Sequence, residues 1–153
     1  MTIAVDFDGT IVEHAYPEIG KEKPFAVDTL IRLQEEGHRI ILWSVREGDR
    51  LEEAVEFCRR RGLEFYAVNS DFPNASWSGS GVSRKVQADI YIDDRNLGGL
   101  PDWDEIYLAI NEKRQLATSK RKKRKERIKK EKKKCWFKRL MERTREARHK
   151  YNG

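Results

Sequence analysis

Short apolar runs alternate along the chain with segments whose apolar residues recur at helical spacing. The apolar runs predict four strands, at residues 2–7, 39–44, 64–68 and 88–92. Apolar residues spaced i, i+3, i+4 predict two helices, over residues 24–37 and 51–62, the first opened by Pro24. This order of strands and helices predicts an α/β fold with a mainly parallel sheet and right-handed crossovers.

The first predicted strand ends in two aspartates. Its apolar residues lead directly into Asp6-Phe7-Asp8-Gly9-Thr10. Because side chains alternate along a strand, Asp6 and Asp8 are expected on one face, about 7 Å apart. Two like charges at this separation repel each other unless a cation lies between them, so the pair predicts a Mg²⁺ site. The alternative is that Asp8-Gly9 forms an ordinary turn.

Further polar residues follow two of the other predicted strands. Ser44 ends the second strand, and Asp93 and Asp94 follow the fourth. The carboxyl ends of parallel strands meet at one edge of a sheet, so these side chains are expected around one crevice together with Asp6 and Asp8. If the fourth strand continued, Asp93 and Asp94 would point to opposite faces, so one of them, preferably Asp93, is expected to bind metal directly.

Four motifs resemble those of the haloacid dehalogenase-like (HAD) hydrolase superfamily, over about residues 1–112. Asp6-Phe7-Asp8-Gly9-Thr10 is similar to the DxDGT motif, Ser44 to the second motif, Arg84-Lys85 to the third and Ile92-Asp93-Asp94 to the fourth. The resemblance is to a small, capless phosphatase-type branch. It implies a Rossmann-like three-layer sandwich with the strands in the spatial order fourth, first, second, third. It also implies a Mg²⁺-dependent phosphatase that acts through an aspartyl-phosphate.

Each expected site residue has a role in such a reaction. Asp6 would attack phosphorus, and Asp8 would protonate the leaving oxygen and then take a proton from water. The expected substrate-binding residues are Ser44, Val45, Arg46 and Lys85. Ser44 and the next backbone amide would hold phosphoryl oxygens, while Lys85 would offset negative charge. Taken alone, Ser44 could be a strand-end cap and Lys85 an exposed surface residue.

The expected metal ligands are oxygen atoms, as Mg²⁺ prefers. They come from Asp6, from Asp8 through its backbone carbonyl, and from Asp93 or Asp94. The three histidines, at positions 14, 38 and 149, lie too far apart to show zinc-ligand spacing. Magnesium is therefore the expected cofactor.

Charge divides the chain into two parts. Residues 1–112 contain 12 Lys/Arg and 22 Asp/Glu, a net charge of −10, whereas residues 113–153 contain 20 Lys/Arg and 4 Asp/Glu, a net charge of +16. We therefore expect an acidic domain at 1–112 and a basic tail at 113–153, helical or partly disordered. The resemblance implies that the domain at 1–112 is a HAD-like phosphatase domain without a large cap. Apolar residues between Phe137 and Tyr151 recur near one face and predict a short basic amphipathic helix.

The basic tail predicts an anionic partner. Nucleic acid is preferred, because phosphate contacts require only clustered Lys and Arg. An anionic membrane surface, the acidic domain itself, and a solvated tail without a partner are the alternatives. No signal peptide or long apolar run is present, and Cys58 and Cys135 form no CxxC motif. A cytoplasmic protein without a transmembrane segment is therefore expected, and oligomerisation is left open.

The expected function is hydrolysis of a small-molecule or nucleotide phosphomonoester. A phosphatase acting on a nucleic acid end or another macromolecule, recruited by the basic tail, is one alternative, and a non-catalytic nucleic-acid-binding module is another. The loops at residues 11–23 and 69–83 are too short to fold as a separate lid, so the crevice is expected to be open.

Overall fold

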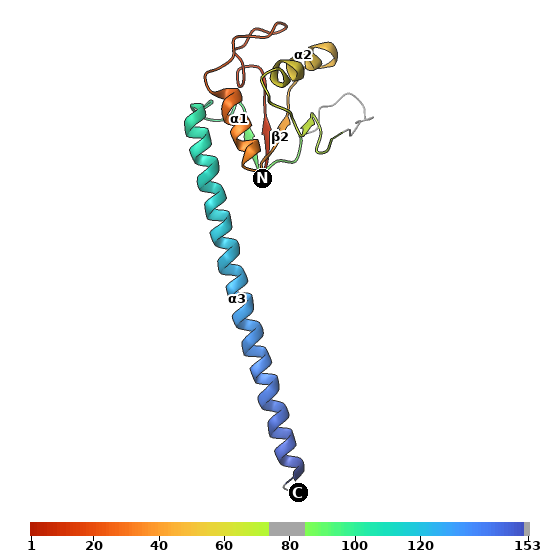
Figure 1. Cartoon of the computed structure of the whole chain (residues 1–153), viewed down its shortest axis with the longest axis vertical. Helices are drawn as coiled ribbons and strands as arrows, with labels where there is room; N and C mark the ends of the chain where they lie inside the picture. Colours follow the sequence, from red (N-terminus) through yellow and green to blue (C-terminus); the bar gives the residue numbers. More distant parts are fainter. Residues whose placement is uncertain (74–84, 152–153) are drawn as a thin grey trace. The chain divides into compact units, whose positions relative to one another are not determined.

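The computed structural model describes residues 1–73 and 85–151, with side chains described up to Phe137. Its elements in chain order are β1 (Thr2–Val5), α1 (Ala26–Glu35), β2 (Arg39–Leu42), α2 (Gly48–Arg59), β3 (Ala67–Val68), β4 (Ile90–Ile92) and α3 (Trp103–Tyr151) (Figure 1). The expected loop at 69–83 lies largely outside the described residues, as do Arg84 and the side chains of the expected amphipathic helix.

The four strands form one sheet in the order β3-β2-β1-β4, and every pair is parallel. The predicted α/β class is therefore confirmed, and the strand order agrees with the order that the resemblance implies. Each strand is shorter than predicted. After β1, the carbonyl of Phe7 accepts hydrogen bonds from the amides of Ile11 and Val12, at 2.9 and 3.1 Å, so the chain turns away soon after Val5.

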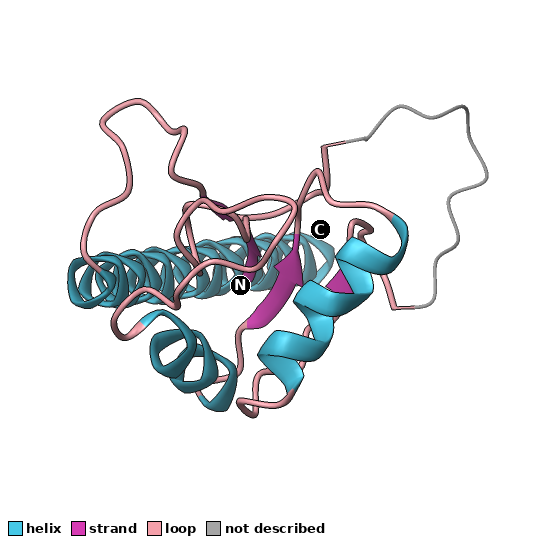
Figure 2. Ribbon diagram, turned by 90° about the horizontal axis from the view of Figure 1, so that it is seen from above, coloured by secondary structure: helices cyan, strands magenta, loops and turns pink. Residues whose placement is uncertain are grey.

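One face of the sheet carries the larger core. Ile3, Val5, Ile40 and Leu42 are fully buried there, together with apolar residues of α1, of α2 and of the first turns of α3. Figure 2 shows α1 and α2 on the same side of the strands. A smaller cluster, Ala4, Ile41, Ala67 and Val86, occupies the opposite face. The described residues thus give one helical layer on the sheet, where the resemblance implied two.

The start of α1 corrects a detail of the sequence analysis. Pro24 was expected to open this helix, but Phe25 has a left-handed backbone conformation with φ 63°. A helix cannot propagate through a left-handed residue. The helix therefore begins at Ala26, two residues later.

Contacts within the chain divide it into two units, Met1–Ile110 and Asn111–Gly153. The first unit contains the whole sheet and both short helices, and the second continues α3. Among the described residues, no helix combines the length and the apolar character that crossing a membrane requires.

Candidate active site

The four strands end at the same level, and this alignment creates the site. In the sheet register, Val5 pairs with Leu42 and with Ile92, and Leu42 pairs with Val68. The residues that come next are Asp6 after β1, Trp43 after β2, Asn69 after β3 and Asp93 after β4. Backbone hydrogen bonds continue one step beyond the strands, from the Asp6 amide to Ile92 and from the Asn69 amide to Leu42. Polar groups from distant parts of the sequence therefore lie side by side.

Three carboxylates converge at this edge. Asp6, Asp93 and Asp94 each place one oxygen within 4.8 Å of the oxygens of the other two. The sequence analysis placed both Asp93 and Asp94 at the crevice and expected one of them, preferably Asp93, to bind metal directly. Because β4 ends at Ile92, the chain no longer alternates as a strand there, and both carboxylates reach Asp6.

Asp94 is held from two sides. Its Oδ2 lies 2.9 Å from Nε2 of His14, and its backbone amide donates to Oγ1 of Thr10 at 3.0 Å. The Thr10 hydroxyl in turn lies 3.5 Å from Oδ2 of Asp6. Gly9 makes room for this arrangement, because a Cβ at this position would lie 2.7 Å from Cγ of Asp94 and closer still to the imidazole of His14.

The donor set fits a magnesium ion. Oδ1 of Asp94 is buried and has no hydrogen-bond partner, and a buried polar atom is normally satisfied. Three carboxylates so close together repel one another unless a cation lies between them. Hard divalent cations take carboxylate oxygens, so Asp6, Asp93 and Asp94 could hold Mg²⁺. Among the described residues, the carboxylate of Asp8 does not belong to this group.

The pKa of Asp6 is raised from 3.8 to about 6. Burial is the largest cause, because it disfavours the charged form, and the negative charges of Asp93, Asp94 and Asp8 add to it. A hydrogen bond from the backbone at Phe7 acts in the opposite direction. The protein therefore holds a strongly perturbed carboxyl where the carboxylates converge.

The carboxylate of Asp8 faces an arginine. Nε and Nη2 of Arg46 donate to its two oxygens at 2.6 and 2.7 Å, and the side chain of Arg46 is fully buried. The hydrogen bonds to Asp8 raise the pKa of the guanidinium above its usual value, with burial opposing them. The expectation of a cation between the Asp6 and Asp8 carboxylates is thus replaced by an ion pair between Asp8 and Arg46.

Arg46 also fixes a loop. Nη1 donates to the carbonyl of Pro17 at 3.1 Å, Nη2 donates to that of Glu18 at 2.7 Å, and the guanidinium lies 5.2 Å from the ring centroid of Tyr16. The N–H groups of the Arg46 guanidinium are thus directed at acceptors within the protein. Arg46, expected to bind substrate, instead connects Asp8 to residues 16–18.

Ser44 is positioned by a residue that the sequence analysis did not identify. Asn69, whose φ is 48°, accepts from the Ser44 amide at 2.8 Å and donates to the Ser44 carbonyl at 2.9 Å. Asparagine tolerates this left-handed conformation better than most residues. The hydroxyl oxygen of Ser44 accepts from the amide of Arg46 at 3.2 Å. Ser44 is consequently held at both its backbone and its side chain.

A small cavity of about 110 Å³ connects these groups. It is lined by Asp6, Asp8, His14, Trp43, Ser44, Val45, Asp93 and Arg95. Val45, one of these lining residues, is 80% exposed. Lys85 does not line the cavity; its Nζ lies 4.4 Å from the ring centroid of Tyr91. A larger groove of about 1060 Å³ runs along α2, but none of the expected site residues lines it.

Four residues of the site were missed or misassigned: His14, Arg46, Asn69 and Arg95. His14 was considered only as a zinc ligand, and its proximity to Asp94 arises from a loop that returns to the sheet edge. Asn69 directly follows a strand, as the acidic residues do, and this placement was a usable signal. Nothing in the sequence pattern distinguished Arg95, which lines the cavity.

These features define an α/β protein with an acidic site at the carboxyl edge of a parallel sheet. No family model and no curated protein matches the chain. A solved structure, described as that of a conserved protein coded by a locus from Bacteroides thetaiotaomicron, is 66% identical, with a TM-score of 0.67. The match covers 74% of this chain and 91% of that one. The chain therefore belongs to the same family as that conserved protein.

Removing the buried guanidinium should destabilise the fold. Arg46→Met leaves the carboxylate of Asp8, which is only 8% exposed, without its partner, so the free energy of unfolding should fall by about 3–5 kcal/mol in urea denaturation. The double variant Asp8→Asn/Arg46→Met removes both charges and should recover part of this loss. Arg50→Met, which breaks an exposed pair with Glu53, is the control and should cause no measurable change. Equal effects of Arg46→Met and Arg50→Met would contradict the assignment.

The raised pKa of Asp6 predicts a pH dependence of stability in metal-free buffer. Between about pH 4 and 6 the unfolded chain has lost this proton while the folded protein keeps it, so rising pH lowers the free energy of unfolding. Asp6→Asn abolishes this contribution. The stability of Asp6→Asn relative to wild type should therefore increase from pH 4 to pH 6 and then remain constant, as measured by denaturation at each pH. Asp28→Asn, an exposed control on α1, should show no such trend; a flat difference for Asp6→Asn would refute the pKa shift.

Proposed function

We propose that the protein is a Mg²⁺-dependent phosphomonoester hydrolase that acts through an aspartyl-phosphate. The observation that carries the proposal is the convergence of Asp6, Asp93 and Asp94 within 4.8 Å, with a buried oxygen of Asp94 left without a partner. The resemblance of the four motifs to HAD-like hydrolases supports it. Bound Mg²⁺ would supply positive charge against the phosphoryl group and the carboxylates.

Asp6 is the proposed nucleophile. One of its oxygens forms a bond to phosphorus while the bond between phosphorus and the leaving oxygen breaks, giving an aspartyl-phosphate and an alkoxide or phenoxide, which takes its proton from solvent water. Its position directly after β1 and in the lining of the cavity supports this role. A nucleophilic carboxyl must be ionised, and a bound cation would favour the ionised form of Asp6 against the burial that raises its pKa.

Asp8 is the proposed base for the second step. Water attacks the phosphorus of the aspartyl-phosphate, its proton passes to Asp8, and inorganic phosphate leaves as the bond to Asp6 breaks. Both oxygens of Asp8 accept hydrogen bonds from a permanently charged guanidinium, an arrangement suited to a carboxylate. Asp8 also lines the cavity, where the attacking water would approach the phosphorus of the aspartyl-phosphate.

Ser44 and the backbone amide of Val45 are the proposed contacts of the phosphoryl oxygens. The two hydrogen bonds between Asn69 and the Ser44 backbone restrict that backbone, so the Ser44 hydroxyl and the Val45 amide are preorganised before substrate binds. Arg95 lines the same cavity and provides a permanent positive charge there. Lys85, at the ring of Tyr91, is not needed in this arrangement.

The size of the cavity bears on the substrate. Its volume of about 110 Å³ is well below the roughly 300–1,000 Å³ of pockets that enclose small-molecule ligands. The cavity would therefore hold a phosphoryl group and leave the rest of the substrate outside. The favoured substrates are small-molecule or nucleotide phosphates with few specific contacts. A phosphorylated nucleic acid end is the second candidate, because its bulk would also remain outside.

Hydrolysis of an aryl phosphate with added Mg²⁺ is the direct test. Asp6→Asn should abolish turnover, Ser44→Ala should lower it by about 10²–10³, and Asp28→Asn should leave it unchanged. Asp8→Asn should still release one equivalent of phenol rapidly, because an acidic leaving group needs no proton, and should then turn over slowly. Wild-type turnover by a folded Asp6→Asn protein would refute the nucleophile, and the absence of a burst with Asp8→Asn would refute the assignment of Asp8 to the second step.

Metal binding can be measured without activity. Adding Mg²⁺ should raise the free energy of unfolding of wild type, by about 2.7 kcal/mol at a hundredfold excess over the dissociation constant. Asp93→Asn removes one carboxylate and should reduce this increment, whereas Asp28→Asn should retain it. An equal increment in Asp93→Asn and wild type would place the ion elsewhere. This readout separates a missing metal site from a wrong substrate.

A further inference from the structure

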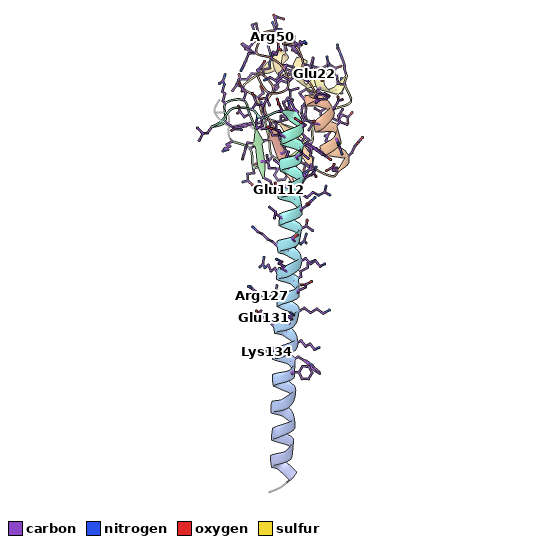
Figure 3. All side chains as sticks on the ribbon, turned by 90° about the vertical axis from the view of Figure 1, so that its left-hand side faces the viewer. Glu22, Arg50, Glu112, Arg127, Glu131 and Lys134 are labelled. Carbon is purple, nitrogen blue, oxygen red and sulfur yellow. The ribbon has the colours of Figure 1, made fainter. Side chains whose placement is uncertain are left out.

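The second unit of the chain continues α3 as an exposed, strongly basic helix. We define its basic segment as residues 113–137, every one of which is exposed. Between Lys120 and Lys134 it contains twelve Lys/Arg and two Glu, a net charge of +10. Figure 3 shows the side chains of Arg127, Glu131 and Lys134 extending from this part of the helix.

The helix does not neutralise its own charge. A helix that is polar on all sides is stable when many pairs of opposite charge, four residues apart, connect its turns. Between Lys120 and Lys134, twelve Lys/Arg face two Glu, and an ion pair joins Arg127 to Glu131 at 3.8 Å. Most of the basic side chains therefore have like-charged neighbours, and an anionic partner would remove this repulsion.

The charge density is that of a polyelectrolyte. Fifteen helical residues span about 22 Å, so the net charge of the Lys120–Lys134 region corresponds to one positive charge per roughly 2 Å. Two unit charges in water interact by RT at about 7 Å, so this spacing is dense enough to hold anions near the helix. Duplex DNA carries one negative charge per about 1.7 Å. A single strand carries about one negative charge per 3.4 Å, so both forms of nucleic acid present a dense row of phosphates to this helix and would release counterions on binding.

The apolar residues of the basic segment do not form a membrane-binding face. At 100° per residue, Ile128 lies about 120° around the helix from Leu116, and Trp136 lies about 200° from it. A helix that lies in a membrane surface, or packs in a coiled coil, needs its apolar residues on one stripe. The described side chains provide no such stripe.

Two aromatic residues end the basic segment. Trp136 and Phe137 are 58% and 50% exposed, and their rings meet edge to face with centroids 5.1 Å apart. Exposed aromatic rings beside clustered Lys and Arg are the combination that binds unpaired bases, because a base can stack on the ring while phosphates contact the cations. A duplex keeps its bases stacked inside and gains less from such rings.

We propose that residues 113–137 form a binding surface for single-stranded nucleic acid. The Lys and Arg side chains contact the phosphates, and Trp136 and Phe137 stack on unpaired bases. This inference does not depend on the proposed hydrolase activity. It can be tested in the Asp6→Asn background, where the proposed nucleophile is absent and the oligonucleotide remains intact.

Binding should be measured by fluorescence anisotropy with the full chain and 20-nucleotide DNA and RNA, from 50 to 200 mM salt. Affinity should fall steeply with salt, by a log–log slope of about 0.7 for each phosphate contacted. The variant K122Q/K123Q/R124Q/K125Q should lower that slope by up to about 3. The matched control is K21Q/R59Q/R60Q/R61Q, which removes four exposed cations from the first unit and should leave both affinity and slope unchanged. Equal losses in the two variants would overturn the proposal, because net charge alone would explain them.

The aromatic contacts have a separate readout. Trp136→Leu should weaken single-strand binding by about fivefold or more and leave duplex binding unaffected. Circular dichroism of the variant should match that of wild type, which separates stacking from helix loss. Tighter binding to the duplex than to the single strand, or binding to phosphatidylserine vesicles that exceeds binding to the oligonucleotides, would overturn the proposal in favour of a duplex-binding or membrane-binding helix.

Discussion

The alignment of the carboxyl ends of four parallel strands is the constraint on which the rest of the site depends. A parallel ladder fixes which residues lie abreast, and here Val68, Leu42, Val5 and Ile92 end their strands together. A shift of one residue in any strand would turn its core residues to the other face and remove its polar residue from the edge. The fully buried apolar residues of β1 and β2 therefore also hold the site in register.

Strand identity and the location of the site were predictable because both follow from short-range patterns. Apolar runs of four to six residues mark buried strands, and a polar residue at the end of each marks the crevice. The strand lengths were not predictable to the residue. Asp6 and Asp8 look equivalent in an alternating pattern, yet the turn closed by the Phe7 carbonyl separates them. Asp6 faces the other carboxylates, and Asp8 faces Arg46.

Long-range pairing explains the remaining errors. Arg46 follows Ser44 by two residues, which suggested a contact with substrate. Its partners Asp8, Pro17 and Glu18, however, lie 38, 29 and 28 residues earlier in the chain. His14 reaches Asp94 across eighty positions. Such contacts depend on how a loop returns to the sheet edge, which local periodicity does not encode.

The balance of charge at the cavity gives the strongest reason for a metal ion. Asp6, Asp8 and Asp93 line it, and an incoming phosphoryl group would bring more negative charge. Arg46 is fully buried and forms an ion pair with Asp8, and Lys85 lies at Tyr91 outside the lining. Among the described lining residues, the permanent positive charge therefore comes from Arg95. One arginine cannot offset a phosphate and the neighbouring carboxylates together. A divalent cation between Asp6, Asp93 and Asp94 would offset this charge, would offer a partner to the unpartnered Asp94 oxygen, and would make the cavity attractive to phosphate.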